Sequence, residues 1–281
     1  DWQGYAINTA DVGVTTTESN YRRDGVTTVS VIDRTDFFLT AGNWTEAMQE
    51  EFRNHNDVIW IDQPESYRGI TAKTLVWLSA SHKRVPHAMV VKADDDSYIR
   101  MGTMASMAKG IRDKNEHLYT GMGCYGHSSV VRNPSSRWYV PHSMYNESDL
   151  FPPYALGGGY VLSARTNECV VHQIQKESLD DIYPVEDGYI AILMQRGCGN
   201  DKSVVCRPQD DLFCAAGPPK PPPVLPVHIR TKVVMHAIKT DSDMMAIHVR
   251  ACCRTERDDR FVQDETSCQA VVCPSQTLFD E

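Results

Sequence analysis

The stretch AMVVKADDDSY, residues 88–98, decides how this chain folds, because an apolar run of strand character ends in three consecutive aspartates. Adjacent carboxylates disfavour one another's ionised forms unless a cation compensates them, and hard divalent ions prefer oxygen ligands. Alternate side chains of an extended segment point the same way, so Asp94 and Asp96 can face one side while Asp95 faces the other. The stretch predicts either a clamp for a metal and a diphosphate or a solvated turn after an edge strand.

Elements outside this stretch alternate between strand and helix. The pattern of short strands is found at residues 5–9, 37–40, 58–61 and 89–93, and helical spacing at 44–55, 70–81 and 101–111. This order predicts an α/β fold with a Rossmann-like, mostly parallel central sheet flanked by helices. In such sheets ligands bind at the carboxyl ends of the strands, where the three aspartates stand.

Composition restricts the function classes. The chain has 281 residues, of which 41% are hydrophobic, enough for a sizeable core. A formal net charge of −9 and the lack of a long Lys/Arg cluster argue against a nucleic-acid partner. No apolar run approaches the roughly 18 residues that cross a bilayer. Because the chain begins with Asp1, we expect a processed piece whose N-terminal membrane anchor is absent.

Cysteines and glycosylation signals favour a secretory compartment. There are nine cysteines, and Asn43 and Asn146 both begin N-x-S/T tripeptides, although Asn43 can instead cap a following helix. The late cysteines lack the paired knuckles of a zinc site, so disulfides are expected, with at least one thiol left over from the odd count. Residues 251–281 are predicted to form a cysteine-rich tail packed on a domain of residues 1–250.

Two further clusters allow two interpretations each. Gly157, Gly158 and Gly159 interrupt a strand-like run, which indicates close backbone approach to a ligand or a bend that needs positive φ. Glu186 and Asp187 precede an apolar helical run, so they are helix N-terminal acids favoured by the macrodipole or a source of a general base.

In order along the chain, these motifs resemble the inverting β-1,3-glycosyltransferase family of the GT-A fold, which includes β-1,3-galactosyltransferases, β-1,3-N-acetylglucosaminyltransferases and Fringe. Residues 65–73 resemble its D-S-Y-x-N-L-T-x-K segment, and Asp94–Asp96 its D-x-D motif. Trp138 and residues 151–160 resemble its acceptor-side run, and Glu186-Asp187 its E-D-V element. Within the family these motifs are most similar to those of the galactosyltransferases that extend the glycosaminoglycan linker.

The resemblance implies a UDP-sugar donor and a divalent metal such as Mn²⁺. Asp96 and Asp94 would be metal ligands, and His228 the C-terminal metal histidine, with His236 as the alternative. Asp94 and Asp95 together would also contact the ribose of the nucleotide or water bound to the metal.

The remaining roles also follow from the resemblance. Lys73 and Arg22 would hold the nucleotide, and Asp187 would be the general base, with Glu186 beside it. The acceptor glycan would be bound by Trp138, Tyr154, Gly157, Gly158 and Gly159.

The implied reaction is transfer of a sugar, with galactose as the expected one, to the 3-hydroxyl of an acceptor in glycosaminoglycan-linker or glycoprotein glycan synthesis. The implied location is the Golgi lumen, with a type II anchor in the full-length protein. Residues 26–30 stand where the family has I-R-x-T-W, so that arginine is missing, and Gly188 replaces an apolar residue after the base. A β-1,3-N-acetylglucosaminyltransferase, a noncatalytic sugar-binding relative and a metal-dependent phosphoryl or nucleotidyl transferase remain as alternatives.

Overall fold

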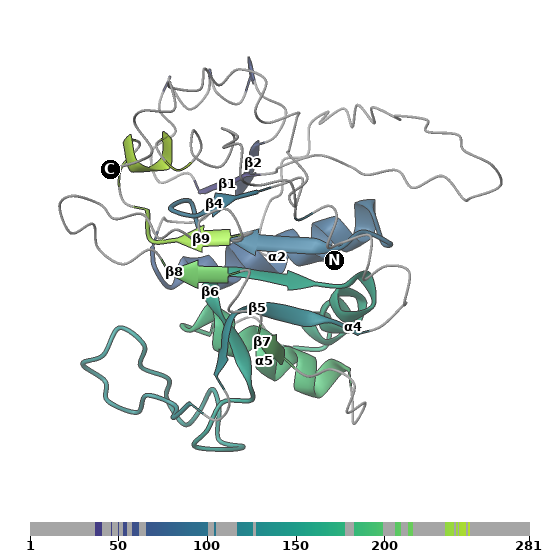
Figure 1. Cartoon of the computed structure of the whole chain (residues 1–281). Helices are drawn as coiled ribbons and strands as arrows, with labels where there is room; N and C mark the ends of the chain where they lie inside the picture. Colours follow the sequence, from purple (N-terminus) through teal and green to yellow (C-terminus); the bar gives the residue numbers. More distant parts are fainter. Residues whose placement is uncertain are drawn as a thin grey trace.

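The computed structural model is an α/β structure (Figure 1). It describes residues 66–100, 117–125, 128–177 and 183–198, short pieces at 37–40, 58–61, 206–208, 213–215 and 234–238, and positions 46, 50, 53–54, 104, 240, 242–245 and 247. The expected strand at 5–9 and the tail at 251–281 lie outside these residues, as do Arg22, Asn43 and His228.

The central sheet has the strand order β3-β6-β5-β7. The long strand β6 (Tyr154–Leu162) lies antiparallel to both β3 (Val90–Ala93) and β5 (Tyr119–Tyr125). Only β7 (Cys206–Pro208) is parallel to its neighbour, β5. The prediction of a mostly parallel sheet is therefore wrong for this sheet. Residues 128–153 connect β5 to β6 through turns instead of a crossover helix, so β6 returns in the opposite direction.

The described residues form two smaller sheets besides the central one. Strands β1 (Phe37–Thr40) and β2 (Val58–Ile61) pair in parallel, which confirms the expected strands and their direction. In the other, β9 (Val234–His236) lies between β4 (Tyr98–Ile99) and β8 (Phe213–Ala215), antiparallel to the first and parallel to the second. Figure 1 shows β9 close to β6, although the two are far apart in sequence.

Three helices pack on one another and on the central sheet. Helix α2 (Gly69–Arg84) buries Leu75 and Leu78 and stops just before Pro86, which cannot continue a helix. Helices α4 (Ala164–Ile174) and α5 (Glu186–Gly197) contact each other and β6. The described helices include none that is both long and apolar enough to cross a membrane.

The core lies between these helices and the sheet. Because β6 is covered on both sides, its residues 160–162 are apolar without alternation and fully buried. Among the described residues, most of the largest fully buried side chains come from α2, β5, β6, α4 and α5: Leu78, Tyr119, Tyr160, Leu162, Ile174, Ile190, Ile192 and Leu193.

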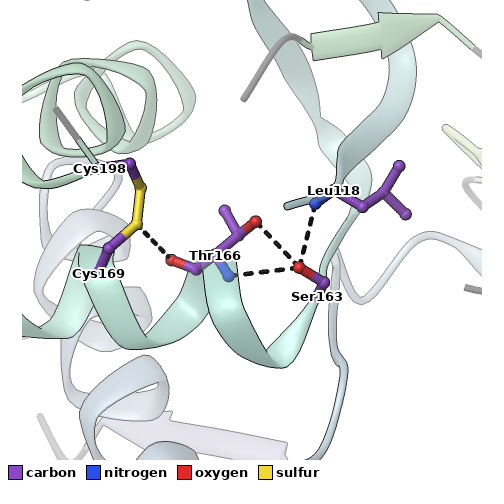
Figure 2. Close-up of a disulfide and its surroundings, with 5 residues drawn as sticks. All are labelled: Leu118, Ser163, Thr166, Cys169 and Cys198. Atoms are coloured by element: carbon purple, nitrogen blue, oxygen red, sulfur yellow. Dashed lines mark hydrogen bonds between the residues drawn. A yellow bond between two sulfur atoms is a disulfide. The ribbon is translucent and has the colours of Figure 1, made fainter. Parts of the chain in front are cut away.

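Two disulfides confirm the expectation that cysteines pair. Cys124 of β5 is joined to Cys206 of β7, and Cys169 of α4 to Cys198 at the end of α5. Figure 2 shows the second bridge beside the start of α4, where Ser163 Oγ accepts hydrogen bonds from the amides of Thr166 and Leu118. This cap satisfies one of the free amides of α4 and ties the helix to Leu118, the residue before β5.

Candidate functional site

The three aspartates form a tight turn between β3 and β4. The Ser97 amide donates to the Asp94 carbonyl at 3.1 Å, which closes the turn. Asp95 is exposed, whereas Asp94 and Asp96 both face His236, with carboxylate oxygens 3.9 and 2.9 Å from its Nδ1. The predicted division of the triplet, two aspartates on one side and one on the other, is therefore confirmed.

His236 ends β9 and completes a cluster that can bind a metal. One ligand atom each from Asp94, Asp96 and His236 lies within 4.8 Å of the others. Two carboxylates and one imidazole are donors that suit Mn²⁺, so the residues fit the ion that the resemblance implies. A second group of potential donors in the described residues contains Cys169 and Cys198, but the disulfide occupies both sulfurs.

Backbone contacts hold His236 against the aspartate turn. Strand β4 pairs with β9, and the amide of Ile238 donates to the Asp96 carbonyl at 2.9 Å. Ala237, between them, has a φ of 68°, a conformation that is costly for a residue with a side chain. Ser97 Oγ lies 3.1 Å from His236 Nδ1 and donates to the Gly158 carbonyl. The backbone is therefore strained at Ala237, next to the histidine that faces the carboxylates.

Asp187 lies in the first turn of α5 and has the properties of a base. Its two carboxylate oxygens accept hydrogen bonds from the amides of Gly157 and Gly188, at 3.1 and 2.9 Å. Burial and the neighbouring Glu186 raise the pKa of Asp187 to about 6, although both amides and Lys92 act in the opposite direction. A carboxyl group with this pKa is ionised near neutral pH and still holds a proton readily.

Glu186 is more deeply buried, and other groups engage both of its oxygens. Tyr160 donates to Oε1 at 2.5 Å, and Lys92 Nζ lies 3.5 Å from Oε2. Both acids lie in the first turn of α5, as the macrodipole interpretation predicts. That position is also compatible with a role of either acid in a functional site.

Lys92 connects the two halves of the site, and the sequence reasoning did not select it. Its Nζ donates to Asp94 Oδ1 at 2.5 Å and to the Gly157 carbonyl at 2.6 Å, and its side chain is only 10% exposed. Burial lowers the pKa of Lys92, but Glu186 and Asp94 outweigh this effect, and the net pKa is raised. Strand alternation placed residue 92 on the same side as residues 94 and 96, a signal that could have identified it.

The glycine run of β6 serves close approach and not a positive-φ bend. Among the described glycines, only Gly123 has a positive φ. A Cβ on Gly158 would lie 2.3 Å from His236 Cγ, and a Cβ on Gly157 would lie 3.4 Å from Glu186 Oε2. Gly159 packs its carbonyl against Gly121 of β5. The run therefore lies between His236 and the Glu186–Asp187 pair, and its contact with an acceptor stays a prediction.

Gly188, which departs from the resembled pattern, has a structural explanation. A Cβ at this position would approach the ring of Phe151 to 2.9 Å. The glycine thus allows Phe151 to pack beside the turn that carries Asp187.

The two predicted acceptor aromatics differ in exposure. Trp138 is 44% exposed, and its Nε1 donates to the hydroxyl of Tyr67, which is 49% exposed. The Arg137 guanidinium lies over both rings, 5.1 Å from the centroid of Tyr67 and 4.4 Å from that of Trp138. Tyr154 is half-buried and packs edge-on against Phe151 in the core.

The structure gives less information on the other residues that were predicted to bind the nucleotide or the metal. Lys73 is half-buried in α2, and Asp95 is exposed on the turn; their nucleotide contacts stay predictions. Arg22 and His228 lie outside the described residues, so the structure provides the alternative histidine, His236.

Comparison with known proteins matches residues 37–198, more than half of the chain, to the family described as galactosyltransferase. The chain belongs to the galactosyltransferase family. The match covers the aspartate turn, the glycine run and the Glu186–Asp187 pair of this galactosyltransferase-family chain, but ends before His236.

Its relatives include beta-1,3-galactosyltransferases. Beta-1,3-galactosyltransferase 5 of Gorilla gorilla gorilla is 28% identical over 154 residues, which are 54% of this chain and 49% of that protein. Beta-1,3-galactosyltransferase 1 of Mus musculus and of Homo sapiens is 27% identical over 156 residues, 54% of this chain and 45% of each relative. The galactosyltransferase-family chain thus spans about half the length of these curated relatives.

Proposed function

We propose that this chain is the catalytic domain, of GT-A type, of a metal-dependent inverting β-1,3-glycosyltransferase. It would transfer galactose from UDP-galactose to the 3-hydroxyl of an acceptor sugar. The observation that carries the proposal is a cluster of potential metal ligands, Asp94, Asp96 and His236, connected through Lys92 and Gly157 to a carboxylate with raised pKa, Asp187. The beta-1,3-galactosyltransferase names of its relatives support galactose and the linkage.

Asp94, Asp96 and His236 would hold the metal. When bound, a divalent ion stabilises the negative charge that develops on the diphosphate of the leaving UDP. Two of these three ligands are restrained by the protein, because His236 is packed on Gly158 and Lys92 binds one oxygen of Asp94.

Asp187 would act as the general base. The acceptor 3-oxygen forms a bond to the anomeric carbon as the bond from that carbon to the UDP oxygen breaks, and the hydroxyl proton passes to Asp187. This single displacement inverts the anomeric centre. Glu186 is the poorer base, because Tyr160 and Lys92 engage its two oxygens. Its charge instead raises the pKa of Asp187, after the larger effect of burial.

Trp138, Tyr67 and Arg137 would form the surface that receives an acceptor sugar. Exposed aromatic rings offer apolar faces to sugar rings, and the hydrogen bond between Trp138 and Tyr67 fixes their geometry in advance. Tyr154 would support this region from the core.

The cellular setting that we propose is the Golgi lumen, with an N-terminal anchor in the full-length protein and a role in glycosaminoglycan-linker or glycoprotein glycan synthesis. Two disulfides agree with a secretory compartment. Asn146, Glu147 and Ser148 are all exposed, so this N-glycosylation signal is accessible.

A UDP-release assay tests the proposed function. UDP-galactose, UDP-N-acetylglucosamine and UDP-N-acetylgalactosamine would each be incubated with β-galactosyl, β-xylosyl and Gal-Xyl acceptors, in Mn²⁺ or EDTA. We expect acceptor-dependent release from UDP-galactose in Mn²⁺ alone. Release from UDP-N-acetylglucosamine would keep the mechanism and change the donor. UDP binding without release for any pair would indicate a noncatalytic sugar-binding relative, and release of pyrophosphate or phosphate another class of transferase.

A further inference from the structure

Lys92 occupies an unusual position, because its side chain is largely buried and a buried lysine needs partners for its charge. Here the ammonium group has three partners, in a turn, a strand and a helix. It binds Asp94 Oδ1 after β3 and the Gly157 carbonyl of β6, and it lies 3.5 Å from Glu186 Oε2 of α5. The mechanism proposed above assigns no step to it.

The contact with Asp94 leaves the second carboxylate oxygen for the metal cluster. Oδ1 binds Lys92, whereas Oδ2 faces His236 Nδ1 at 3.9 Å. Hydrogen bonds from neighbouring groups orient the carboxylates that bind metals, and loss of such a partner typically lowers metal affinity about 10–100-fold.

The contact with Gly157 reaches the base. The carbonyl of Gly157 accepts from Lys92, and its amide donates to Asp187 Oδ2 at 3.1 Å. A continuous series of three hydrogen bonds therefore runs from Asp94 through Lys92 and Gly157 to Asp187, across segments that lie 65 and 30 residues apart in sequence.

We propose that Lys92 is a positioning residue that fixes the metal-binding carboxylate of Asp94 relative to the carboxylate of Asp187, by binding Asp94 and Gly157 at once. The inference rests on the proposed function, because it assigns Asp94 to a metal and Asp187 to proton transfer. It adds a residue that acts through Asp94 and Gly157 and sets the separation of the two carboxylates.

The charge of Lys92 also affects the base. The titratable groups that face Asp187 are Glu186 beside it, Lys92 of β3 and the buried phenols of Tyr119 and Tyr160. Among them Lys92 is the cation that lowers the pKa of Asp187. Removal of Lys92 is therefore expected to move the acid limb of the pH–rate profile to higher pH.

The test compares Lys92→Met with Lys83→Met, the same substitution at an exposed lysine of α2. Mn²⁺ binding would be measured from the electron paramagnetic resonance signal of free Mn²⁺ with UDP present, and kcat/KM across pH. We expect Lys92→Met to bind Mn²⁺ about 10–100-fold more weakly and to need higher pH for activity, with Lys83→Met close to wild type. A folded Lys92→Met protein with wild-type Mn²⁺ affinity and pH profile would overturn the proposal.

A second variant guards against misfolding, since Lys92→Met leaves buried acids without their cation. Lys92→Met combined with Glu186→Gln removes both charges. We expect it to unfold near the wild-type temperature yet still bind Mn²⁺ about 10–100-fold more weakly, because Asp94 Oδ1 lacks its donor. Wild-type Mn²⁺ affinity in the double variant would refute the positioning role alone. If the wild-type protein itself showed no Mn²⁺-linked UDP binding, the proposed function would fail together with it.

Discussion

Replacement of Gly158 by alanine is expected to disable the proposed metal site without replacing any of its ligands. The new Cβ would lie 2.3 Å from His236 Cγ and 2.5 Å from Cδ2. Because carbon atoms settle about 3.5–4.0 Å apart, the imidazole has to move by roughly 1.2 Å or more. Metal–ligand distances tolerate only about ±0.2 Å, so Mn²⁺ affinity should fall by about 10–100-fold. Overpacking should also cost about 1–3 kcal/mol of stability.

Calorimetric titration of UDP in Mn²⁺ and in EDTA, together with thermal unfolding, measures both effects. Gly157→Ala is the matched comparison, because its Cβ would meet its neighbours at 3.4–3.8 Å, an ordinary contact distance. Adding His236→Ala to Gly158→Ala removes the contacts with Cγ and Cδ2 and leaves the one with His236 Cβ at 2.9 Å, so stability should recover in part while Mn²⁺-linked binding does not. If Gly158→Ala kept wild-type Mn²⁺-linked UDP affinity, His236 would not be a ligand and the reasoning would be refuted.

Three further predictions concern the base, its neighbour and the helix disulfide. Asp187→Asn should abolish transfer and leave UDP binding intact, and wild-type kcat/KM should fall as pH drops through about 6, where Asp187 gains its proton. Because the folded pKa of Asp187 exceeds the ordinary 3.8, ionisation of Asp187 destabilises the fold progressively between these two values and fully above about pH 6. The difference in free energy of unfolding between Asp187→Asn and wild type should therefore shift in favour of the variant by about 1–3 kcal/mol from pH 3.5 to pH 7.5 in denaturant titrations, because the cost of turning an amide NH2 toward one of the two backbone amides is the same at both pH values. Tyr160→Phe removes the buried donor to Glu186 and should lower the free energy of unfolding by about 1–3 kcal/mol; a loss under 0.5 kcal/mol would argue against that bond. Cys169→Ser with Cys198→Ser opens a loop of sequence separation 29 and should cost about 3–4 kcal/mol, and an unchanged unfolding midpoint would contradict the bridge.

Local sequence patterns were sufficient for the parts of the site that depend on one segment. Strand alternation alone predicts that Asp94 and Asp96 share a side and that Asp95 does not, and the turn confirms it. The position of Glu186 and Asp187 at the start of α5 was also predictable, because the helix macrodipole favours acids there.

Long-range pairing decides what the sequence left open. His236 reaches the aspartates because β4 pairs with β9, across more than 130 residues, and no local pattern specifies that register. The direction of β6 depends on the turns of residues 128–153, which propensities do not distinguish from a crossover. The two disulfides of the described residues likewise follow from the fold and not from spacing.

Titration of UDP into the wild-type protein and into His236→Ala, each with Mn²⁺ and with EDTA, tests the central claim most directly. If Asp94, Asp96 and His236 hold the metal that binds the donor, wild-type protein binds UDP tightly only with Mn²⁺, and folded His236→Ala loses that dependence. Asp96→Ala should behave in the same way, whereas His228→Ala should not. A His236→Ala protein that keeps wild-type Mn²⁺-dependent UDP affinity would contradict the account.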